Sequence, residues 1–304
     1  MKSICIFGIF VADLCFIGNS IPEKGQTILG NNHIVGPGGK GSNQAIASGR
    51  LGGKVNFITK IGKDQNADIA LSLYKEVGIN TDSIIQDDNN LTGVAGIMVN
   101  EKTGENAINV VPGAAGTLVK KDIDDNFKFI EKSEIFLTQL ETPYEVTSYA
   151  LNKAKETGSI TIFNPAPASD ITEDDFKSID YFTPNETEAS FYLNEKVESK
   201  SEIERAAKAF LDKGVKNVII TLGSKGVYFA NSDESYFVDA FKLKSEVVDT
   251  TGAGDAFNGA FAYALSINQN NRDAIVFSNK VAGISTTKSG AANSIPTISE
   301  VENY

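Results

Sequence analysis

The stretch VVDTTGAGDAFNGAF, residues 247–261, carries the strongest structural signal in this chain. Three small residues, Gly252, Ala253 and Gly254, precede an aspartate and a helical pattern over 255–266. Glycine in a helix is less favourable than alanine by about 1 kcal/mol. A bare backbone is favoured where amide N–H groups must approach an anion, and the helix dipole adds to that attraction. We therefore expect these three residues to form an anion hole.

Asp255 follows this expected anion hole directly. A carboxylate there is placed to accept a proton from an attacking hydroxyl group. The amides would stabilise a phosphate that becomes more negative during transfer. The alternative is that Asp255 caps the helix, a position that aspartate favours. Asp249 and Thr251, just upstream, carry oxygens of the kind that hard cations bind.

Composition limits the classes of partner. The chain has 304 residues and a net charge of −11, so it repels nucleic acid and anionic membranes, and we expect neither as a partner. We find no long apolar run and no signal peptide. The two cysteines, Cys5 in an apolar run and Cys15, predict free thiols in a reducing cytoplasm. The single His33 cannot supply a histidine metal cluster.

Short apolar runs alternate with helical patterns along most of the chain. Strands are predicted at 3–8 and 54–62 and helices at 41–52 and 64–78, and the alternation recurs towards residue 230. This pattern predicts an α/β fold with a mostly parallel sheet between two helical layers. Two segments, about 10–36 and 91–112, lack helical periodicity and predict a small separate β lid on a single domain spanning 1–304.

The stretch GPGGKGSNQA, residues 36–45, formally matches the dinucleotide-binding pattern G-x-G-x-x-G. It follows a lid strand instead of the first strand of a βαβ unit, which weakens that interpretation. Lys40 precedes a glycine, so the stretch is no phosphate-binding P-loop either. Two alternatives remain. The glycines let the backbone approach a ligand, with Lys40 and Asn43 facing its hydroxyls, or the loop is a flexible hinge.

Taken together, GPGGKGSNQAIASGRLG and VVDTTGAGDAFNGAF resemble the two signatures of the ribokinase/PfkB family of carbohydrate kinases. Between them lie TQLETP, NPAPA, TPNETEA and TLGSKG, in the order and spacing of that family. The resemblance covers essentially the whole chain and is strongest to ribokinases. It implies a three-layer αβα sandwich with a β lid, and ATP-dependent phosphorylation of the primary hydroxyl of a pentose, D-ribose foremost, to the 5-phosphate.

The resemblance also implies roles for individual positions. Asp255 would be the general base and residues 252–254 the anion hole. The implied sugar-binding residues are Asp13, Gly39, Lys40, Asn43, Glu141 and Asp255. The implied nucleotide-binding residues are Asn185, Thr221, Gly223, Ser224, Gly226, Gly254 and Asn279.

Cations are implied as well. Glu188 would act indirectly on Mg²⁺, and K⁺ would be held by Asp249, Thr251, Ser285, Lys288, Gly290 and Ser294. Ordinary alternatives exist for three of the implied positions. Asn185 could be a helix cap, Glu188 a solvated helix acid, and Asp13 a turn residue.

The chain departs from the ribokinase pattern where Val11 stands in place of an asparagine, Ala115 in place of another, and Lys288 in place of a frequent arginine. Loss of an amide at position 11 weakens the preference for a hydroxylated sugar, so the sugar remains open between ribose and 2-deoxyribose. Other candidates are a hexose or nucleoside kinase, an ATP-independent lyase or glycosidase, and a non-enzymatic sugar sensor. The lid strands predict a homodimer, with Ile97 and Ile108 either over the sugar or in the dimer core.

Overall fold

A computed structural model describes all 304 residues. The main sheet has nine strands in the order β13-β12-β11-β10-β9-β8-β1-β4-β5. All neighbours are parallel except the β11–β12 and β12–β13 pairs. The strands are β1 (Ser3–Phe7), β4 (Lys54–Ile61), β5 (Ile84–Gln86), β8 (Ile135–Thr138), β9 (Ile160–Phe163), β10 (Tyr181–Phe182), β11 (Asn217–Thr221), β12 (Val227–Asn231) and β13 (Ser235–Val238).

Alternation along β1 explains why helices cover both faces of this sheet. Ile4 and Ile6 join one buried cluster, and Cys5 and Phe7 join another, because successive strand side chains point to opposite faces. The helices and short 3₁₀ turns are α1 (Lys40–Arg50), α2 (Gln65–Glu76), η1 (Ala114–Thr117), α3 (Lys120–Asp125), α4 (Phe127–Glu131), α5 (Tyr144–Glu156), α6 (Glu173–Lys177), α7 (Glu186–Leu193), α8 (Lys200–Asp212), η2 (Gly223–Lys225), α9 (Ala253–Ser266), α10 (Asn271–Ser285), η3 (Ala292–Ser294) and α11 (Ile298–Asn303).

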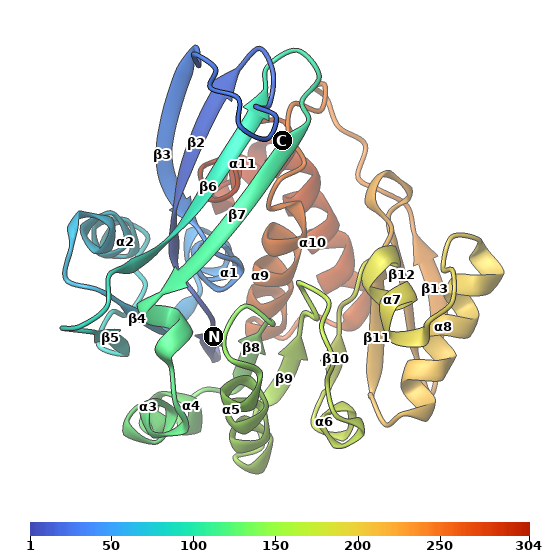
Figure 1. Cartoon of the computed structure of the whole chain (residues 1–304). Helices are drawn as coiled ribbons and strands as arrows, with labels where there is room; N and C mark the ends of the chain where they lie inside the picture. The colour runs from blue at the N-terminus through green and yellow to red at the C-terminus, as the bar shows by residue number, and fades with distance from the viewer.

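The two clusters belong to different helices. Buried residues of α1, α2, α9 and α10 form the first, and those of α5, α7 and α8 belong to the second. Helix α9 packs against both α1 and α10, and all but its first two residues are buried. The predicted three-layer α/β sandwich is therefore confirmed (Figure 1). Helix α9 begins at Ala253, two residues before its predicted start.

A second sheet of four strands extends away from the sandwich, at the upper left of Figure 1. We call it the flap sheet, and its order is β3 (Asn32–Gly38), β2 (Val11–Gly18), β6 (Thr92–Asn100), β7 (Asn106–Gly113). The predicted β lid is confirmed, and so is the predicted hairpin, because β6 and β7 pair antiparallel. The central pair β2–β6 is parallel, since its strands come from two separate insertions.

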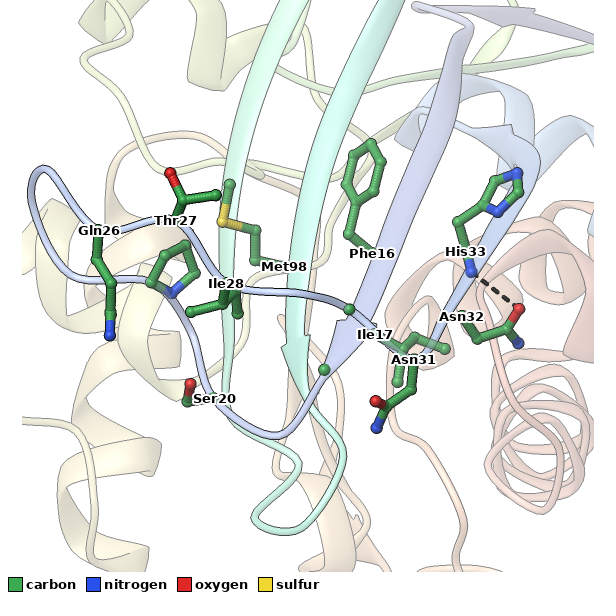
Figure 2. Close-up of a pocket in the computed structure, with 13 residues that line it drawn as sticks. Phe16, Ile17, Ser20, Gln26, Thr27, Ile28, Asn31, Asn32, His33 and Met98 are labelled. Carbon is green, nitrogen blue, oxygen red and sulfur yellow. Dashed lines mark hydrogen bonds between the residues drawn. The ribbon is translucent and has the colours of Figure 1, made fainter.

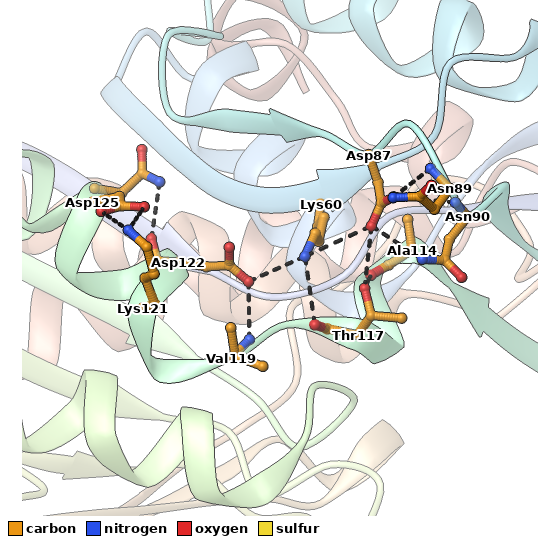
Figure 3. A network of polar contacts seen from close by, with 11 residues as sticks. Lys60, Asp87, Asn89, Asn90, Ala114, Thr117, Val119, Lys121, Asp122 and Asp125 are labelled. Carbon is orange, nitrogen blue, oxygen red and sulfur yellow. Dashed lines mark hydrogen bonds and ion pairs between the residues drawn. The ribbon is translucent and has the colours of Figure 1, made fainter.

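Two ion pairs hold the flap sheet where β6 and β7 join the sandwich. The Lys60 ammonium lies 3.7 Å from the Asp87 carboxylate, ahead of β6, and 3.3 Å from the Asp122 carboxylate, after β7. Figure 3 shows Lys60 between these two acids. The hydroxyl of Thr117 donates to Asp87 at 3.4 Å, which links the two connections to each other. The other two connections, before β2 and after β3, contain Gly8 and Gly39, where a Cβ would lie within 3 Å of other protein atoms.

Candidate active site

The predicted site residues gather at the carboxyl edge of the parallel strands, where open α/β sheets bind ligands. Glu141 follows β8, Asn185 follows β10, and Thr221 ends β11. The first turns of α1 and α9 lie at the same edge, because Asn43 of α1 donates to Asp255 of α9. No helix of the chain is both long enough and apolar enough to span a membrane.

The start of α9 leaves amides free, but not the three that the sequence predicts. Gly252 is the N-cap and has φ 75°, a left-handed conformation that glycine adopts without strain. The Ala253 amide donates to the Thr250 carbonyl at 3.2 Å, so that donor is engaged within the turn. The amides of Gly252, Gly254 and Asp255 donate to no acceptor in the protein. Three N–H groups at a helix N-terminus therefore remain available to an anion.

The Asp255 carboxylate does not cap the helix. Its Oδ2 accepts a hydrogen bond from Asn43 Nδ2 at 2.9 Å, and its Oδ1 accepts one from Gln44 Nε2 at 3.0 Å. The residue is 5% exposed. The side chain is thus fixed by α1 instead of by its own helix. Asn43 Oδ1 is buried and has no partner in the protein, so it can accept a hydrogen bond from a ligand.

Three other predicted sugar-binding residues lie around Asp255. Burial, followed by the charge of Asp255, raises the pKa of Asp13 to about 6. Burial raises the pKa of Glu141 to about 7, against the attraction of Lys40. The charge of Asp255 raises the pKa of Lys40, although burial opposes it. Glu141 also accepts a hydrogen bond from the Lys40 backbone amide at 2.7 Å. Perturbed carboxyls around one cationic side chain are typical of functional sites.

A cavity of about 180 Å³ opens beside Asp255. Residues predicted to bind the sugar and residues predicted to bind the nucleotide or Mg²⁺ both line it. They are Lys40, Asn185, Glu188, Thr221, Gly252, Gly254 and Asp255. Asn185 and Glu188 also form a capping box at the start of α7, so Asn185 is a helix cap as well as a lining residue. Burial raises the pKa of Glu188, which argues against a solvated helix acid.

The remaining predicted nucleotide residues do not line this cavity. Gly223 and Ser224 lie in η2, immediately beyond Thr221. Gly226 has φ 98°, and a Cβ there would lie 2.0 Å from the Val238 carbonyl oxygen, so its glycine is required by packing. Asn279, on α10, donates to the Asp239 carbonyl at 2.8 Å and ties α10 to the segment after β13.

The predicted cation residues lie in two loops that pair with each other. Asp249 accepts hydrogen bonds from the amides of Thr251 at 2.9 Å and Gly290 at 2.8 Å, which hold its pKa below the ordinary value although burial acts the other way. Ser285 and Ser294 donate to nearby backbone carbonyls. The Lys288 ammonium pairs with Glu300 at 2.6 Å.

Four buried amide side chains at the site are absent from the predicted residues. Gln44 contacts Asp255, Gln139 donates to Gln44, and Asn164 accepts from Gln44 at 3.1 Å. Asn258 Nδ2 donates to the Gly254 carbonyl at 2.9 Å. A sequence signal existed for two of them, because Gln139 and Asn164 each directly follow an apolar strand at the edge that binds ligands.

A larger cavity, about 590 Å³, lies elsewhere, on the flap sheet. Figure 2 shows Phe16 and Met98 from neighbouring strands beside the loop that carries Gln26 and Ile28. Phe16 points to the face opposite Asp13, because strand side chains alternate. This cavity contains no carboxylate, lysine or arginine. The charged chemistry of the chain therefore belongs to the smaller cavity.

Comparison with known proteins gives one consistent result. The model of the pfkB family carbohydrate kinases matches residues 1–298. A ribokinase of Haemophilus influenzae is 38% identical over 303 residues, which cover 100% of this chain and 98% of that protein. A deoxyribokinase of Salmonella typhimurium is 34% identical over 304 residues, covering 99% and 98%.

A solved structure of Arabidopsis thaliana ribokinase complexed with ribose and ATP superimposes with a TM-score of 0.91 at 27% identity, covering 99% of this chain and 98% of that one. Sequence and fold thus agree over nearly the full length. The chain belongs to the pfkB family of carbohydrate kinases.

Proposed function

We propose that this chain is an ATP-dependent kinase that phosphorylates the primary hydroxyl of a pentose, D-ribose foremost, to the 5-phosphate. One observation carries the proposal. Unengaged amides at the start of α9 and the Asp255 carboxylate border the same cavity, so an anion site and a base lie side by side. The family and the relatives that act on ribose support the same reaction.

The proposed mechanism uses each group for one task. Asp255 accepts the proton of the sugar hydroxyl, whose oxygen then attacks the γ-phosphorus of ATP, and ADP leaves. The amides of Gly252, Gly254 and Asp255 stabilise the charge on the migrating phosphoryl group. Lys40 adds a positive charge from the wall of the same cavity. The flap sheet carries Asp13 and would exclude water from the reacting groups.

Sugar hydroxyls fit the acceptors gathered around Asp255. Asp13 and Glu141 offer carboxylate oxygens, and the buried Oδ1 of Asn43 lacks a donor that a hydroxyl would supply. Gly39 has φ 87°, and a Cβ there would lie 2.7 Å from the Ile9 carbonyl oxygen, so Gly39 brings the loop close to the connection between β1 and β2.

Magnesium and potassium are the cations we propose. No group of three or more His, Cys, Asp or Glu side chains is arranged to hold a metal ion by itself. Mg²⁺ would therefore be held chiefly by ATP phosphates, with Glu188 acting through water. Asp249 joins the loops of Thr251 and Gly290 through amide hydrogen bonds, and its carboxylate with carbonyl oxygens of these loops would hold K⁺ next to the anion hole. Lys288 is engaged with Glu300, so its side chain belongs less clearly to that set.

A 2-deoxy pentose is the second candidate substrate. Val11 is 2% exposed and lies two residues from Asp13 on β2, so both side chains are on the same face. An apolar side chain offers no hydrogen bond to a ring hydroxyl, and such a site rejects the deoxy sugar only weakly. The similarity to a deoxyribokinase supports this alternative. Hexose and nucleoside kinases remain weaker candidates, and the anion hole argues against an ATP-independent lyase or a sugar sensor.

We also propose that the protein is a cytoplasmic homodimer joined through the flap sheet. Strand register places Ile34, Cys15, Ile97 and Ile108 in one row across it, on the face that carries Asp13. Ile34 is 46% exposed and Ile108 is 53% exposed. An apolar row of this kind favours association with a second copy.

A substrate panel tests the proposed reaction. Native protein is incubated with ATP, Mg²⁺ and K⁺ and with ribose, 2-deoxyribose, fructose or adenosine, and the phosphorylated product is identified by mass spectrometry. We expect ribose 5-phosphate or deoxyribose 5-phosphate, formed with equimolar ADP. ADP without a phosphorylated sugar, or no turnover on the whole panel, would refute the proposal.

A further inference from the structure

Gln44 is the residue that joins Asp255 to a buried chain of amides. Its Nε2 donates to Asp255 Oδ1 at 3.0 Å and to Asn164 Oδ1 at 3.1 Å. Gln44 is 0% exposed, so no solvent competes for these contacts. It occupies the position after Asn43 on α1 and faces the other carboxylate oxygen of Asp255. Each oxygen of the base therefore has one amide donor.

The orientation of Gln44 is itself fixed from the opposite side. Gln139 Nε2 donates to Gln44 Oε1, which leaves Gln44 Nε2 pointing at Asp255. The tight fit of Gln139 depends on Gly8, because a Cβ on Gly8 would lie 2.3 Å from Gln139 Oε1. Asn164 is held in turn, since its Nδ2 donates to the Thr183 carbonyl at 3.1 Å. The end of β8, the end of β9 and the start of α1 thus converge on one side chain.

We infer that Gln44 is a positioning residue that holds the Asp255 carboxylate in the orientation needed for proton abstraction, with Gln139 and Asn164 fixing Gln44. This inference rests on the proposed function of Asp255 as the base. A general base must lie within hydrogen-bond reach of the proton it accepts, and small misplacements slow the reaction strongly. Gln44 is fully buried behind Asp255 and Asn164 and is not itself one of the residues that line the cavity, so it acts through Asp255.

A purely structural role makes different predictions. Ser48, one turn further along α1, donates to the Gly259 carbonyl of α9 at 2.8 Å and is also fully buried. It joins the same two helices without contacting Asp255. Ser48→Ala is therefore the matched control for loss of a polar contact between α1 and α9.

The test compares Gln44→Met, Gln139→Met and Ser48→Ala with the native protein. Methionine keeps the length of glutamine but donates no hydrogen bond. Gln44→Met should lower kcat by about 10- to 100-fold, the effect of losing a hydrogen bond to a charged group, and leave KM for sugar and ATP within about threefold. Gln139→Met should lower kcat by a smaller factor, about 3- to 10-fold, because Gln44 keeps its contact. Ser48→Ala should lower the melting temperature and leave kcat within about twofold.

Conservative replacement by an acid adds an independent measurement. Gln44→Glu preserves shape but places an acceptor against Asp255. Lys40, Asp13, Glu141 and Glu188 also act on this carboxylate electrostatically and are unchanged in the variant. The acid limb of kcat against pH should therefore move to higher pH relative to native, because a second acid disfavours the charged form of the base.

Three results would overturn the inference: a native kcat in folded Gln44→Met, a rise in KM with kcat unchanged, or an equal loss of kcat in Ser48→Ala. If Gln44→Met does not fold, an unchanged kcat in Gln139→Met overturns it. A native protein without kinase activity refutes the proposed function separately. In that case a crystal structure of Gln44→Met tests the positioning role of Gln44 without any activity. An Asp255 carboxylate oriented as in the native protein would contradict that role.

Discussion

Two glycine-containing loops meet at the site, and glycines of the first loop and Gly254 of the second have opposite surroundings. In the first, residues 36–41, a Cβ on Gly38 would lie 2.1 Å from Asp13 Oδ1, and one on Gly41 would lie 2.6 Å from the Cα of Gly8. In the second, residues 252–254, a Cβ on Gly254 would meet nothing within 4 Å. Gly38 and Gly41 leave no room for a side chain because the protein packs against them, and Gly254 faces open space.

This difference separates packing from ligand binding. Gly254 lies inside α9, where glycine is less favourable than alanine by about 1 kcal/mol, and no protein contact compensates for that loss. The missing side chain is explained if a ligand approaches the backbone there. The hinge alternative for the first loop is not favoured, since close backbone contacts on Gly39 and Gly41 hold it in place.

The largest effect should come from Asp255→Ala, which tests whether the second loop serves chemistry. Removal of a general base lowers kcat by about 10²- to 10⁴-fold, and lost positioning of the sugar adds to this. ATP should still bind, because the amides at the start of α9 remain. Turnover is measured by coupled ADP release and ATP binding by calorimetry. A kcat within tenfold of native would exclude Asp255 as the base.

Gly254→Ala should separate activity from stability. The added methyl group enters the space beside the proposed phosphoryl site, so we expect kcat to fall by about 10- to 100-fold. The melting temperature should stay the same or rise, because alanine is the better helix residue. A variant that loses stability while retaining full kcat would remove the distinction between the two loops.

Gly41→Ala should do the reverse. The methyl group would meet the backbone of Gly8 at a distance that side chains do not tolerate, so we expect a loss of about 1–3 kcal/mol in the free energy of unfolding. Denaturant titration measures it. Gly96→Ala is the control, since a Cβ at Gly96, on the flap sheet, meets nothing within 4 Å. Equal stability of the two variants would contradict the packing role of the first loop.

The smallest effect concerns pH. The pKa of Asp13 is about 6, raised by burial and then by Asp255, so this carboxyl gains a proton as the pH falls through 6. It then loses acceptor capacity for a sugar hydroxyl, so kcat/KM for the sugar should fall as the pH drops through 6, in addition to any loss from Glu141, whose pKa burial raises to about 7. Asp13→Asn should weaken this dependence while lowering kcat/KM at pH 7.5. An acid limb unchanged by Asp13→Asn would assign it to another group.

Sequence patterns were sufficient for the layers of the fold, and several charged residues that they select line one cavity. Short continuous apolar runs such as 3–8, and a run of small residues before an acid such as 252–255, depend on neighbouring residues alone, so the sequence is enough to detect them. Gln44 was not predicted, because its role arises from contacts with Asn164 and Asp255, which lie 120 and 211 positions away. The hydrogen bond from the Ala253 amide to the Thr250 carbonyl was not predicted either, because it depends on the conformation of the turn before α9.

The central claim is that the start of α9 receives the migrating phosphoryl group while Asp255 accepts the hydroxyl proton. A crystal structure with the sugar and a non-hydrolysable ATP analogue tests it most directly. We predict γ-phosphate oxygens about 2.7–3.1 Å from the amide nitrogens of Gly254 and Asp255, and the primary hydroxyl within about 3.2 Å of the Asp255 carboxylate. A γ-phosphate bound away from residues 252–255, with the sugar in place, would contradict the account.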